Sequence, residues 1–463
     1  MSLFDSIYEY NKKNPHRFHT PGHKGRLSGF DVYGMDITEI PEMDDLHEPA
    51  GVIKDMEERL AGLYGAASGH FLVNGTTLGI MCGIFAMIEE GDRVLIQRNS
   101  HRCVYNGLML RKAEPVFIKS KTDKYGITEP VSAEAIDQAL QDKDRIKLVI
   151  LTTPTYEGVV INLKDISEIL HKQNIPLLVD SAHGAHSGIF GKMQNPISLG
   201  ADIAVEGLHK TLPFLTQSAA LLYSPRGEKY RERVKLYLDC FESSSPSYIL
   251  MAAGDRGIRI LEEKGEELFW KLEENLEIFY NQAKGLSNIR VLEDSGRDQS
   301  KIIITLEDAA FKNGERVSMR DVYAGLLSQN IVPEMLNSRY ILCMTSIMNT
   351  REDFQRLSEV LEEMDKELIS EKHGAENKII EFKAPKAVMS MGEAVNKDRE
   401  RLPIKKALGR VAGDFVEIFP PGIPIVLPGE IIDYKAVEDI ENGLNANLEV
   451  RGIDNGKIIC VNG

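Results

Sequence analysis

The sequence contains few cysteines and no long apolar run. Its five cysteines are scattered, odd in number and without a C-x-x-C pair, so neither disulfides nor a structural zinc site is expected. No apolar run approaches the length of a membrane span. The first residues lack the basic and then apolar stretch of a signal peptide. These absences predict a protein of the reducing cytoplasm with no membrane partner.

Positive charge is also in short supply. Lysine and arginine number 55 against 70 aspartates and glutamates, which gives a formal net charge of −15. A nucleic-acid-binding protein usually has the opposite balance, so nucleic acid is not an expected partner. An acidic surface would weakly favour the approach of a cationic small molecule. Acidity that only aids solubility explains the balance equally well.

A chain of 463 residues is long enough for two or three domains. Strand and helix signals alternate from about residue 51, which predicts an α/β fold with a mainly parallel sheet and helices on both faces. A long helical pattern runs to Ala283, with Trp270 on its apolar side. We expect an N-terminal arm at 1–50, a large domain at 51–290, a small α+β domain at 291–370, and a linker with a C-terminal α+β domain at 371–463.

Lys210 lies in a short turn between two apolar runs, 201–205 and 214–222. A lysine in that position is partly removed from water, which lowers the pKa of its amine and makes it nucleophilic. Such an amine can form a Schiff base with a carbonyl cofactor. Taken alone, an ordinary surface lysine at a strand end is the commoner explanation.

Two further features change that balance. Asp180 ends an apolar run, and a partly buried carboxylate needs a cationic or hydrogen-bonding partner, such as a protonated pyridine nitrogen. Residues 74–77 form a polar turn between a strand and a helix, where backbone N–H groups and two hydroxyls would bind phosphate. Each alone could be a helix cap. Together with Lys210 they supply the covalent tether, pyridinium partner and anion site that pyridoxal phosphate needs.

Other polar residues also follow predicted strands, and ligands of such sheets bind beyond the carboxyl ends of the strands. We therefore expect one site made by Asn74 to Thr77, His101, Thr155 and Tyr156, Asp180 to His183, and His209 with Lys210. The pairs His19 and His23, and His183 and His186, have spacings that could bind a metal. No further ligands complete a zinc set, and Pro21 and Gly22 interrupt a helix at the first pair, so no metal is predicted.

These residues belong to a set of motifs that resembles the fold-type-I ornithine/lysine/arginine decarboxylases, in particular the short bacterial form without an N-terminal wing domain. The resemblance runs from about residue 15 to about residue 435. The motifs are His19-Thr20-Pro21-Gly22-His23-Lys24-Gly25, Asp44-Asp45-Leu46-His47, Leu72-Val73-Asn74-Gly75-Thr76-Thr77, Arg98-Asn99-Ser100-His101, Asp180-Ser181-Ala182-His183-Gly184-Ala185-His186, His209-Lys210-Thr211-Leu212-Pro213, Ser245-Pro246-Ser247-Tyr248, Phe419-Pro420-Pro421-Gly422-Ile423-Pro424 and Pro428-Gly429-Glu430.

The resemblance implies a pyridoxal 5'-phosphate enzyme with an aspartate-aminotransferase-like large domain, a smaller α+β domain and a small C-terminal decarboxylase domain. It implies a role for each matching residue: Lys210 holds the cofactor covalently, Asp180 pairs with the pyridinium nitrogen, His101 stacks on the ring, Asn74, Gly75, Thr76 and Thr77 form the phosphate site, and His183 and His209 lie near the reacting carbon. His209 or Lys210 would return a proton to that carbon.

One pair of residues departs from the family pattern. Relatives usually have a Gln-Ser or similar pair where this chain has Glu206 and Gly207, and the serine hydroxyl helps to bind phosphate. Here a hydroxyl is lost, and a carboxylate is expected close to an anion. Cofactor affinity and substrate preference could both differ.

The implied reaction is decarboxylation of arginine, lysine or ornithine to carbon dioxide and the corresponding polyamine-pathway amine, in a cytoplasmic homodimer or higher homo-oligomer with the active site at the interface. Candidates to bind the cationic substrate tail are Asp44, Asp45, Glu48, Tyr156 and Glu334, some of them across the interface. Two alternatives remain open. One is another enzyme of this fold, such as a lyase or an aminotransferase that binds a carboxylate through Arg339. The other is a catalytically silent binding protein, in keeping with Glu206 and Gly207.

Overall fold

The structure, a computed structural model, describes residues 2–29, 31–142, 145–190, 193–306, 309–371, 380–382, 384–419, 423–445 and 449–462. Most of the charged connector expected at 371–377 lies outside these residues, as do Pro420, Pro421 and Gly422 of the C-terminal motif. None of the described helices is both long and apolar enough to cross a membrane.

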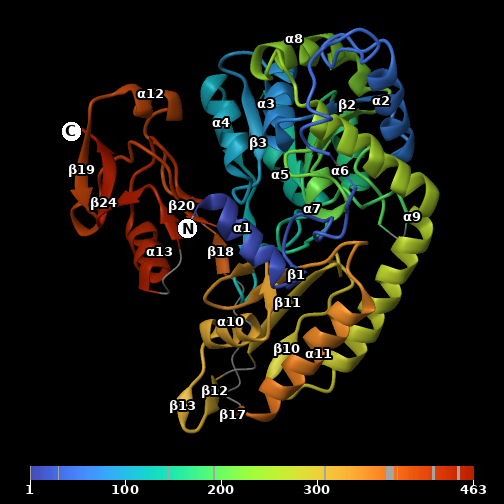
Figure 1. The fold of residues 1–463 in the computed structure, drawn as a ribbon. Coiled ribbons are helices and arrows are strands. Elements are labelled where there is room, and N and C mark those ends of the chain that lie inside the picture. Colours follow the sequence, from blue (N-terminus) through green and yellow to red (C-terminus); the bar gives the residue numbers. More distant parts are fainter. Residues whose placement is uncertain are drawn as a thin grey trace.

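A seven-stranded sheet forms the centre of the large domain (Figure 1). Only one of its strands runs against the others, so the mainly parallel sheet predicted from the sequence is confirmed. Strands β7 and β8 are buried along their whole length, and β6 is buried except at Lys147, which explains why these strands are mainly apolar. In spatial order the strands are β2 (Ser68–Leu72), β9 (Ala219–Tyr223, the antiparallel strand), β8 (Ile203–Glu206), β7 (Leu177–Ser181), β6 (Ile146–Thr152), β3 (Arg93–Ile96) and β4 (Glu114–Phe117).

Helices cover both faces of this sheet. On one face lie α3 (Gly75–Met87), α4 (Arg102–Leu110) and α8 (Arg231–Phe241). On the other lie α2 (Val52–Leu63), α5 (Ala133–Asp142), α6 (Leu163–Lys172) and α9 (Tyr248–Ala283). Shorter elements of this part of the chain are β5 (Ser120–Thr122), α7 (Leu208–Thr211) and the 3-10 helix Gly227–Tyr230.

The position expected for Trp270 on α9 is wrong. Its side chain is 62% exposed, whereas its neighbour Phe269 is 5% exposed. The buried stripe of α9 continues from Phe269 through Leu272 and Leu276, which is the i, i+3, i+7 spacing of one helix face. Trp270 lies about 100° around the helix from Phe269 and therefore points to solvent.

The small domain continues from α9. Its antiparallel sheet has the order β10 (Ile289–Val291), β11 (Lys301–Leu306), β16 (Ile341–Met344) and β15 (Met335–Leu336), with α10 (Met319–Ser328) and α11 (Arg351–Lys366) beside it. A second sheet contains β12 (Ala309–Lys312), β13 (Glu315–Arg316) and β17 (Ile369–Glu371). The N-terminal arm, with α1 (Leu3–Lys12), joins this domain because β1 (His16–Phe18) pairs in parallel with β14 (Ile331–Pro333).

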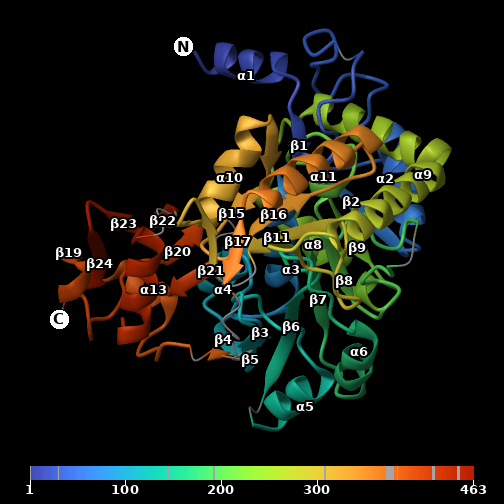
Figure 2. The same ribbon diagram turned by 90° about the horizontal axis from the view of Figure 1, so that it is seen from below.

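The C-terminal segment forms a lobe of its own beside α4 (Figures 1 and 2). It has a separate apolar core, yet its Met391, Phe415 and Leu427 pack into the core around α3 and α4. It also reaches the large domain where β18 (Ile380–Phe382) pairs with β5. Its other elements are α12 (Met391–Asn396), β19 (Arg399–Pro403), the 3-10 helix Ile404–Lys406, β20 (Val416–Phe419), β21 (Ile423–Val426), α13 (Tyr434–Asn445), β22 (Glu449–Arg451), β23 (Ile453–Asp454) and β24 (Lys457–Val461). The exact domain limits stay a prediction.

Candidate active site

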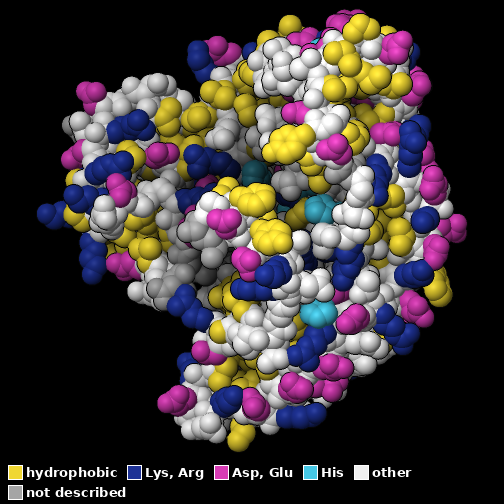
Figure 3. Space-filling view, in the orientation of Figure 1, with side chains coloured by type: hydrophobic (Ala, Val, Ile, Leu, Met, Phe, Trp, Pro, Cys, Tyr) yellow, Lys and Arg dark blue, Asp and Glu magenta, His cyan; other side chains and the backbone are white. Residues whose placement is uncertain are grey.

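The predicted site residues follow the carboxyl ends of the central strands. Histidine side chains come to the surface in the middle of the face shown in Figure 3, where that face is hollowed. Nζ of Lys210 lies 2.9 Å from Nε2 of His183. The His183 ring packs edge-on against the Tyr156 ring, with 4.7 Å between centroids. The Tyr156 hydroxyl donates to Glu334 at 2.8 Å. Segments more than a hundred residues apart therefore meet here.

Lys210 is held by the turn between β8 and the short helix α7. Burial lowers the pKa of its amine, while the carboxylates of Asp180 and Glu334 oppose that effect. His183 is also buried, and its pKa is held well below the usual range by burial and by the cations of Lys210 and Lys301. The imidazole is therefore neutral at pH 7. A partly desolvated amine beside a neutral imidazole is an arrangement suited to nucleophilic attack on a carbonyl.

Asp180 ends β7 and is 2% exposed. One carboxylate oxygen accepts the backbone N–H of Ala182 at 3.1 Å. The carboxylate is close enough to raise the pKa values of both Lys210 and His101. A buried carboxylate with remaining acceptor capacity, directed among cationic and imidazole groups, suits the protonated nitrogen of a pyridine ring.

The expected phosphate site is the N-terminus of α3. Gly75 has a φ of +72° and its N–H donates to the carbonyl of Gln217 at 2.8 Å. This positive φ turns the chain from β2 into the helix and favours glycine. The side chain of Asn74, the N-cap, makes no cap hydrogen bond among the described residues. The first-turn N–H groups, including those of Thr76 and Thr77, lack intrahelical acceptors and can bind an anion.

His101 is the N-cap of α4, and its Nδ1 accepts the backbone N–H of Cys103 at 3.2 Å. His101 is exposed as a residue. Desolvation by nearby protein atoms lowers the pKa of its imidazole, the charge of Asp180 raises it, and the charge of Lys210 lowers it. A neutral imidazole can stack on a planar cofactor. Lys210, Asp180, His101 and the α3 N-terminus thus fit pyridoxal phosphate as tether, nitrogen partner, stacking ring and phosphate site.

His209 connects this site to the N-terminal arm. Its Nδ1 lies 2.9 Å from the carbonyl of Ser218, and its own carbonyl accepts the N–H of Gly22 at 2.7 Å. Burial is the main cause of a lowered pKa for His209. The turn of the arm around Gly22 therefore packs directly on the lysine-bearing segment.

Gly207 has a structural reason to be glycine. A Cβ added there would lie 2.3 Å from the carbonyl oxygen of Ala182, so the β8–α7 turn and the segment after β7 touch through their backbones. The serine hydroxyl of the family pattern has no room at this backbone separation. Its absence follows from close packing, and Gly207 can still offer a backbone N–H.

Most of the extra negative charge expected from Glu206 is absent at neutral pH. The side chain is fully buried, and neither carboxyl oxygen has a hydrogen-bond partner among the described residues. Burial and the nearby Asp180 raise its pKa to about 8, although the neighbouring Ser181 opposes this. Glu206 also affects the pKa of Tyr64, which belongs to the core on the α2 side of the sheet. It is therefore a mostly neutral acid beneath the site.

The structure separates the candidate substrate residues into two groups. Glu334 lies with Tyr156 at the site and also accepts the N–H of Thr20 at 2.7 Å. The Asp44 carboxylate accepts backbone N–H groups at the start of α2. The Asp45 carboxylate accepts the N–H of His47, and the Glu48 carboxylate accepts a bond from Lys235 on α8. Their part in substrate binding stays a prediction. Arg339, the residue considered for an aminotransferase, donates to the carbonyl of Lys124 at 2.8 Å.

Three buried charged residues near the site were not predicted from the sequence. Lys301 is 1% exposed, and its Nζ lies 3.3 Å from both Asp298 and the carbonyl of His183. Asp298 in turn lies 3.2 Å from Nε2 of His186. Lys24 of the arm is buried and donates to the carbonyls of His19 and Met344. A lysine that opens the apolar strand Lys301–Leu306 was a usable signal, since such a cation needs a buried partner.

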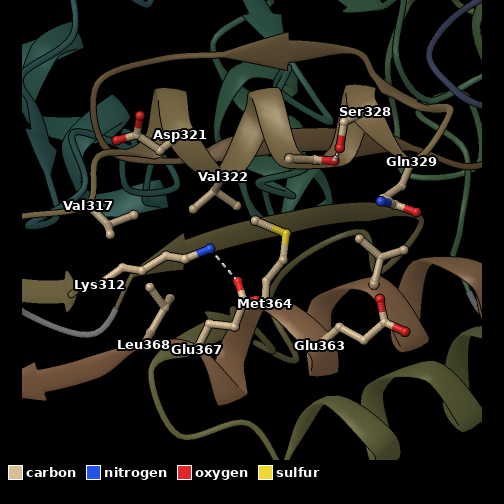
Figure 4. A pocket seen from close by; sticks show the side chains of 12 residues that line it. Lys312, Val317, Asp321, Val322, Ser328, Gln329, Glu363, Met364, Glu367 and Leu368 are labelled. Carbon is tan, nitrogen blue, oxygen red and sulfur yellow. Dashed lines mark hydrogen bonds and ion pairs between the residues drawn. The ribbon is translucent and has the colours of Figure 1, made fainter.

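Two other features lie outside this site. Across the described ranges, no group of three or more His, Cys, Asp or Glu side chains could hold a metal ion. A cavity of about 310 Å³ lies between α10 and α11 (Figure 4). Lys312 and Glu367 at its edge form an ion pair, and Asp321 caps α10 through Ser318. Its charged groups are thus mostly engaged within the protein.

The chain also matches known protein families over most of its length. Residues 1–299 match the Orn/Lys/Arg decarboxylase major domain, and residues 375–442 match the Orn/Lys/Arg decarboxylase C-terminal domain. An arginine decarboxylase of Bacillus subtilis (strain 168) is 30% identical, over 97% of this chain and 95% of that protein.

Solved structures show the same fold. The constitutive lysine decarboxylase of Escherichia coli has a TM-score of 0.76 at 17% identity, covering 94% of this chain and 76% of that one. A structure of SPT with PLP has a TM-score of 0.53 at 18% identity, covering 67% and 76%. The fold is that of the fold-type-I PLP enzymes with an added C-terminal domain, and the chain belongs to the Orn/Lys/Arg decarboxylase family.

Proposed function

We propose that this protein decarboxylates a basic amino acid with pyridoxal phosphate as cofactor, and that the amino acid is arginine. The observation that carries the proposal is the partly desolvated amine of Lys210, 2.9 Å from the neutral imidazole of His183 and within electrostatic reach of Asp180. Membership of the family supports decarboxylation of a basic amino acid. The similarity to an arginine decarboxylase over nearly the full chain favours arginine over lysine and ornithine.

Pyridoxal phosphate, when bound, supplies an electron-withdrawing ring that accepts the electron pair left behind as carbon dioxide departs. Lys210 would hold it covalently and Asp180 would keep its ring nitrogen protonated. His101 would cover one ring face, and the N–H groups and hydroxyls of Thr76 and Thr77 would bind its phosphate. Each assignment uses a group that the structure leaves exposed or with free bonding capacity.

Side chains around the reacting carbon would orient the substrate and return the proton. Bond choice depends on holding the substrate carboxylate in one orientation, which is a matter of positioning. The low pKa of His183 keeps its ring neutral, so it can orient groups by hydrogen bonding without adding charge. Lys210 and His209 are adjacent in sequence, and either can return a proton to the α-carbon. Both groups are half-buried, which limits the access of water that would compete for that proton.

Glu334 is the residue we assign to the cationic tail of the substrate. It lies with Tyr156 and is close enough to the site to affect the pKa values of both Lys210 and His209. Its carboxylate accepts bonds from Tyr156 and Thr20, which orient it and leave lone pairs for an ammonium or guanidinium group.

The N-terminal arm supports a homo-oligomer. The exposed residues Leu3, Phe4, Ile7 and Tyr8 of α1 give this helix an apolar surface, visible as hydrophobic side chains over α1 in Figure 3. Such a surface suits a second copy of the chain, and the arm also touches His209. We accordingly propose a cytoplasmic homodimer or higher oligomer with its site near the interface, forming an amine of the polyamine class.

The test is carbon dioxide release from arginine, lysine and ornithine, with pyridoxal phosphate added and omitted. Cofactor-dependent release from arginine in excess of the other two is expected. In the Lys210→Ala variant the rate should fall by roughly three orders of magnitude or more, and the borohydride-sensitive visible absorbance should disappear. Release from none of the three by a protein with bound cofactor would overturn the proposal and favour another reaction of this fold.

A further inference from the structure

The loop that carries His101 connects β3 to α4, and we call residues 97–101 the β3–α4 loop. Its interior is tightly bonded. The Oγ of Ser100 donates to the carbonyl of Gln97 at 2.8 Å, and the side-chain oxygen of Gln97 accepts the N–H of Thr152 at 2.6 Å. The hydroxyl of Tyr105 donates to the carbonyl of Arg98 at 2.5 Å. The loop backbone is thus fastened to β6 and α4.

The side chain of Arg98 leaves the large domain and enters the C-terminal lobe. It forms two hydrogen bonds to the carboxylate of Glu430, at 2.6 and 2.9 Å, and a third to the carbonyl of Ile425 at 3.1 Å. Arg98 is 3% exposed and Glu430 is 1% exposed. Glu430 also accepts the N–H of Leu427 at 2.7 Å. A buried bidentate pair of this kind tolerates only one relative position of its partners.

A second arginine makes a parallel contact on the other side of His101. Arg102 donates to Glu417 at 3.1 Å, and its guanidinium carbon lies 3.5 Å from the centre of the Phe415 ring. Glu417 is buried, and Phe415 belongs to the core around α3 and α4. His101 therefore stands between two arginines that each form an ion pair with a carboxylate more than 300 positions later in the chain.

We propose that the C-terminal lobe is part of the cofactor site, with Glu430 and Glu417 acting as positioning residues that hold His101, through Arg98 and Arg102, in the orientation needed to stack on the cofactor ring. This proposal rests on the proposed function, because it assumes that His101 meets the cofactor. It gives a role to two motifs of the sequence, Arg98 to His101 and Pro428 to Glu430. The roles assigned to the catalytic residues do not account for these motifs. Among the described residues of the lobe, none forms a hydrogen bond or ion pair with Lys210 or Asp180, so the lobe acts through the loop.

The physical reason lies in what each carboxylate contributes. The hydrogen bond from the Cys103 N–H restricts rotation of the His101 ring. The position of the whole loop depends on Arg98 and Arg102, on either side of that ring. If Glu430 loses its charge, Arg98 remains buried without its counter-ion and must move toward water. The loop would move with it, and a stacking ring displaced by a fraction of an ångström loses contact with its partner.

The experiment compares E430Q and E417Q with the matched control E400Q. Glu400 belongs to the same lobe and pairs with Arg410, but this pair is partly exposed and far in sequence from the β3–α4 loop. Three quantities are measured for each protein: the dissociation constant for pyridoxal phosphate, the induced circular dichroism of the bound cofactor, and hydrogen exchange of residues 97–105 in cofactor-free protein. E417Q keeps the buried Arg98–Glu430 pair, so it still tests the proposal if E430Q does not fold.

We expect E430Q to bind pyridoxal phosphate about tenfold more weakly or worse, with reduced induced circular dichroism and faster exchange confined to residues 97–105. E417Q should change in the same direction by less, and E400Q should match the wild type. Wild-type cofactor affinity and circular dichroism in both E430Q and E417Q would overturn the proposal, as would faster exchange throughout the lobe without any local effect. A wild-type protein that binds no cofactor would instead overturn the proposed function.

Discussion

Gly207 shows how one residue can be constrained by packing rather than by chemistry. Its backbone faces the Ala182 carbonyl so closely that a Cβ would lie 2.3 Å from that oxygen. Glu206, next to it, is kept mostly neutral at pH 7 by burial, with a pKa raised to about 8. The pair that departs from the family pattern thus neither adds charge to the phosphate site nor has room for a hydroxyl.

Gly207→Ser is therefore expected to harm the protein although it restores the hydroxyl of the family pattern. The added atoms should force the β8–α7 turn away from Ala182 and lower the free energy of unfolding by about 1–3 kcal/mol. Cofactor affinity should fall because Lys210 lies in the displaced turn. Urea unfolding and cofactor titration measure the two effects. Gly62→Ser is the control, since a Cβ at Gly62 meets no atom within 4 Å. A tighter-binding and equally stable Gly207→Ser would contradict this account.

Glu334→Gln tests the residue assigned to the substrate tail. Removing the charge should raise KM for arginine roughly 10- to 100-fold, because a charge-assisted hydrogen bond becomes a neutral one. The value of kcat should change little, and binding of an uncharged analogue of the same length should be unaffected. Steady-state kinetics measure these quantities, with Glu315→Gln on β13 as an exposed control. An unchanged KM would remove Glu334 from the substrate site.

At the scale of single elements, α2 illustrates a carboxylate that serves structure. The Asp44 carboxylate accepts the N–H groups of Ala50, Gly51 and Ile53 at 2.8–2.9 Å, at the start of the helix. Burial alone would raise its pKa, but these backbone hydrogen bonds dominate and the pKa is lowered. Asp44 thus neutralises the helix N-terminus from a position seven residues before the N-cap, Gly51.

Asp44→Ala is expected to lower the free energy of unfolding by about 1–2 kcal/mol at pH 7. A depressed carboxyl pKa contributes stability that is fully present above the unfolded value, near pH 4, and is lost as the pH falls through the folded value. The difference between wild type and variant should therefore shrink in acid. Urea unfolding at pH 7 and at pH 3 measures it, with Asp45→Ala as the milder neighbour. Unchanged stability with a raised KM would return Asp44 to the substrate site.

At the scale of the whole molecule, the N-terminal arm is fastened across the small domain and α7. Asp353 on α11 pairs with both His16 and Arg26. Lys24 is enclosed between the arm and β16, where burial lowers its pKa to about 7 despite the favourable charge of Glu334. The arm is therefore held by a buried amine that changes charge near neutral pH.

Docking of the arm should tighten as the pH rises from 7 to 9. Over this range the folded chain holds Lys24 neutral while the unfolded chain still binds its proton, so stability rises with pH by at most about 1.4 kcal/mol per unit. Hydrogen exchange of residues 16–24, corrected for intrinsic rates, measures the effect. Lys24→Met should abolish the pH dependence. The same dependence in both proteins would assign it to another group.

Much of the fold could be predicted because it depends on local pattern. The apolar run before Asp180 predicts β7, and the alternation of strand and helix signals predicts the mainly parallel sheet. The prediction for Trp270 fails because the buried stripe of α9 passes through its neighbour Phe269. The pairing of β1 with β14, between residues about 315 positions apart, left no local signal.

The sequence by itself determined the order of elements and which polar residues follow the strands, because strand ends and helix starts are written in short-range apolar spacing and turn chemistry. It also carried the motifs that identify the family. Only the tertiary structure decided that Glu206 is a buried and mostly neutral acid and that Gly207 faces another backbone closely. It also decided that Asp44 bonds to the start of a helix, whereas Glu334 acts electrostatically on Lys210. The pairing of Glu430 with Arg98 in the loop of His101 likewise depends on the tertiary structure. These outcomes depend on desolvation and close contact between distant segments, which no local pattern specifies.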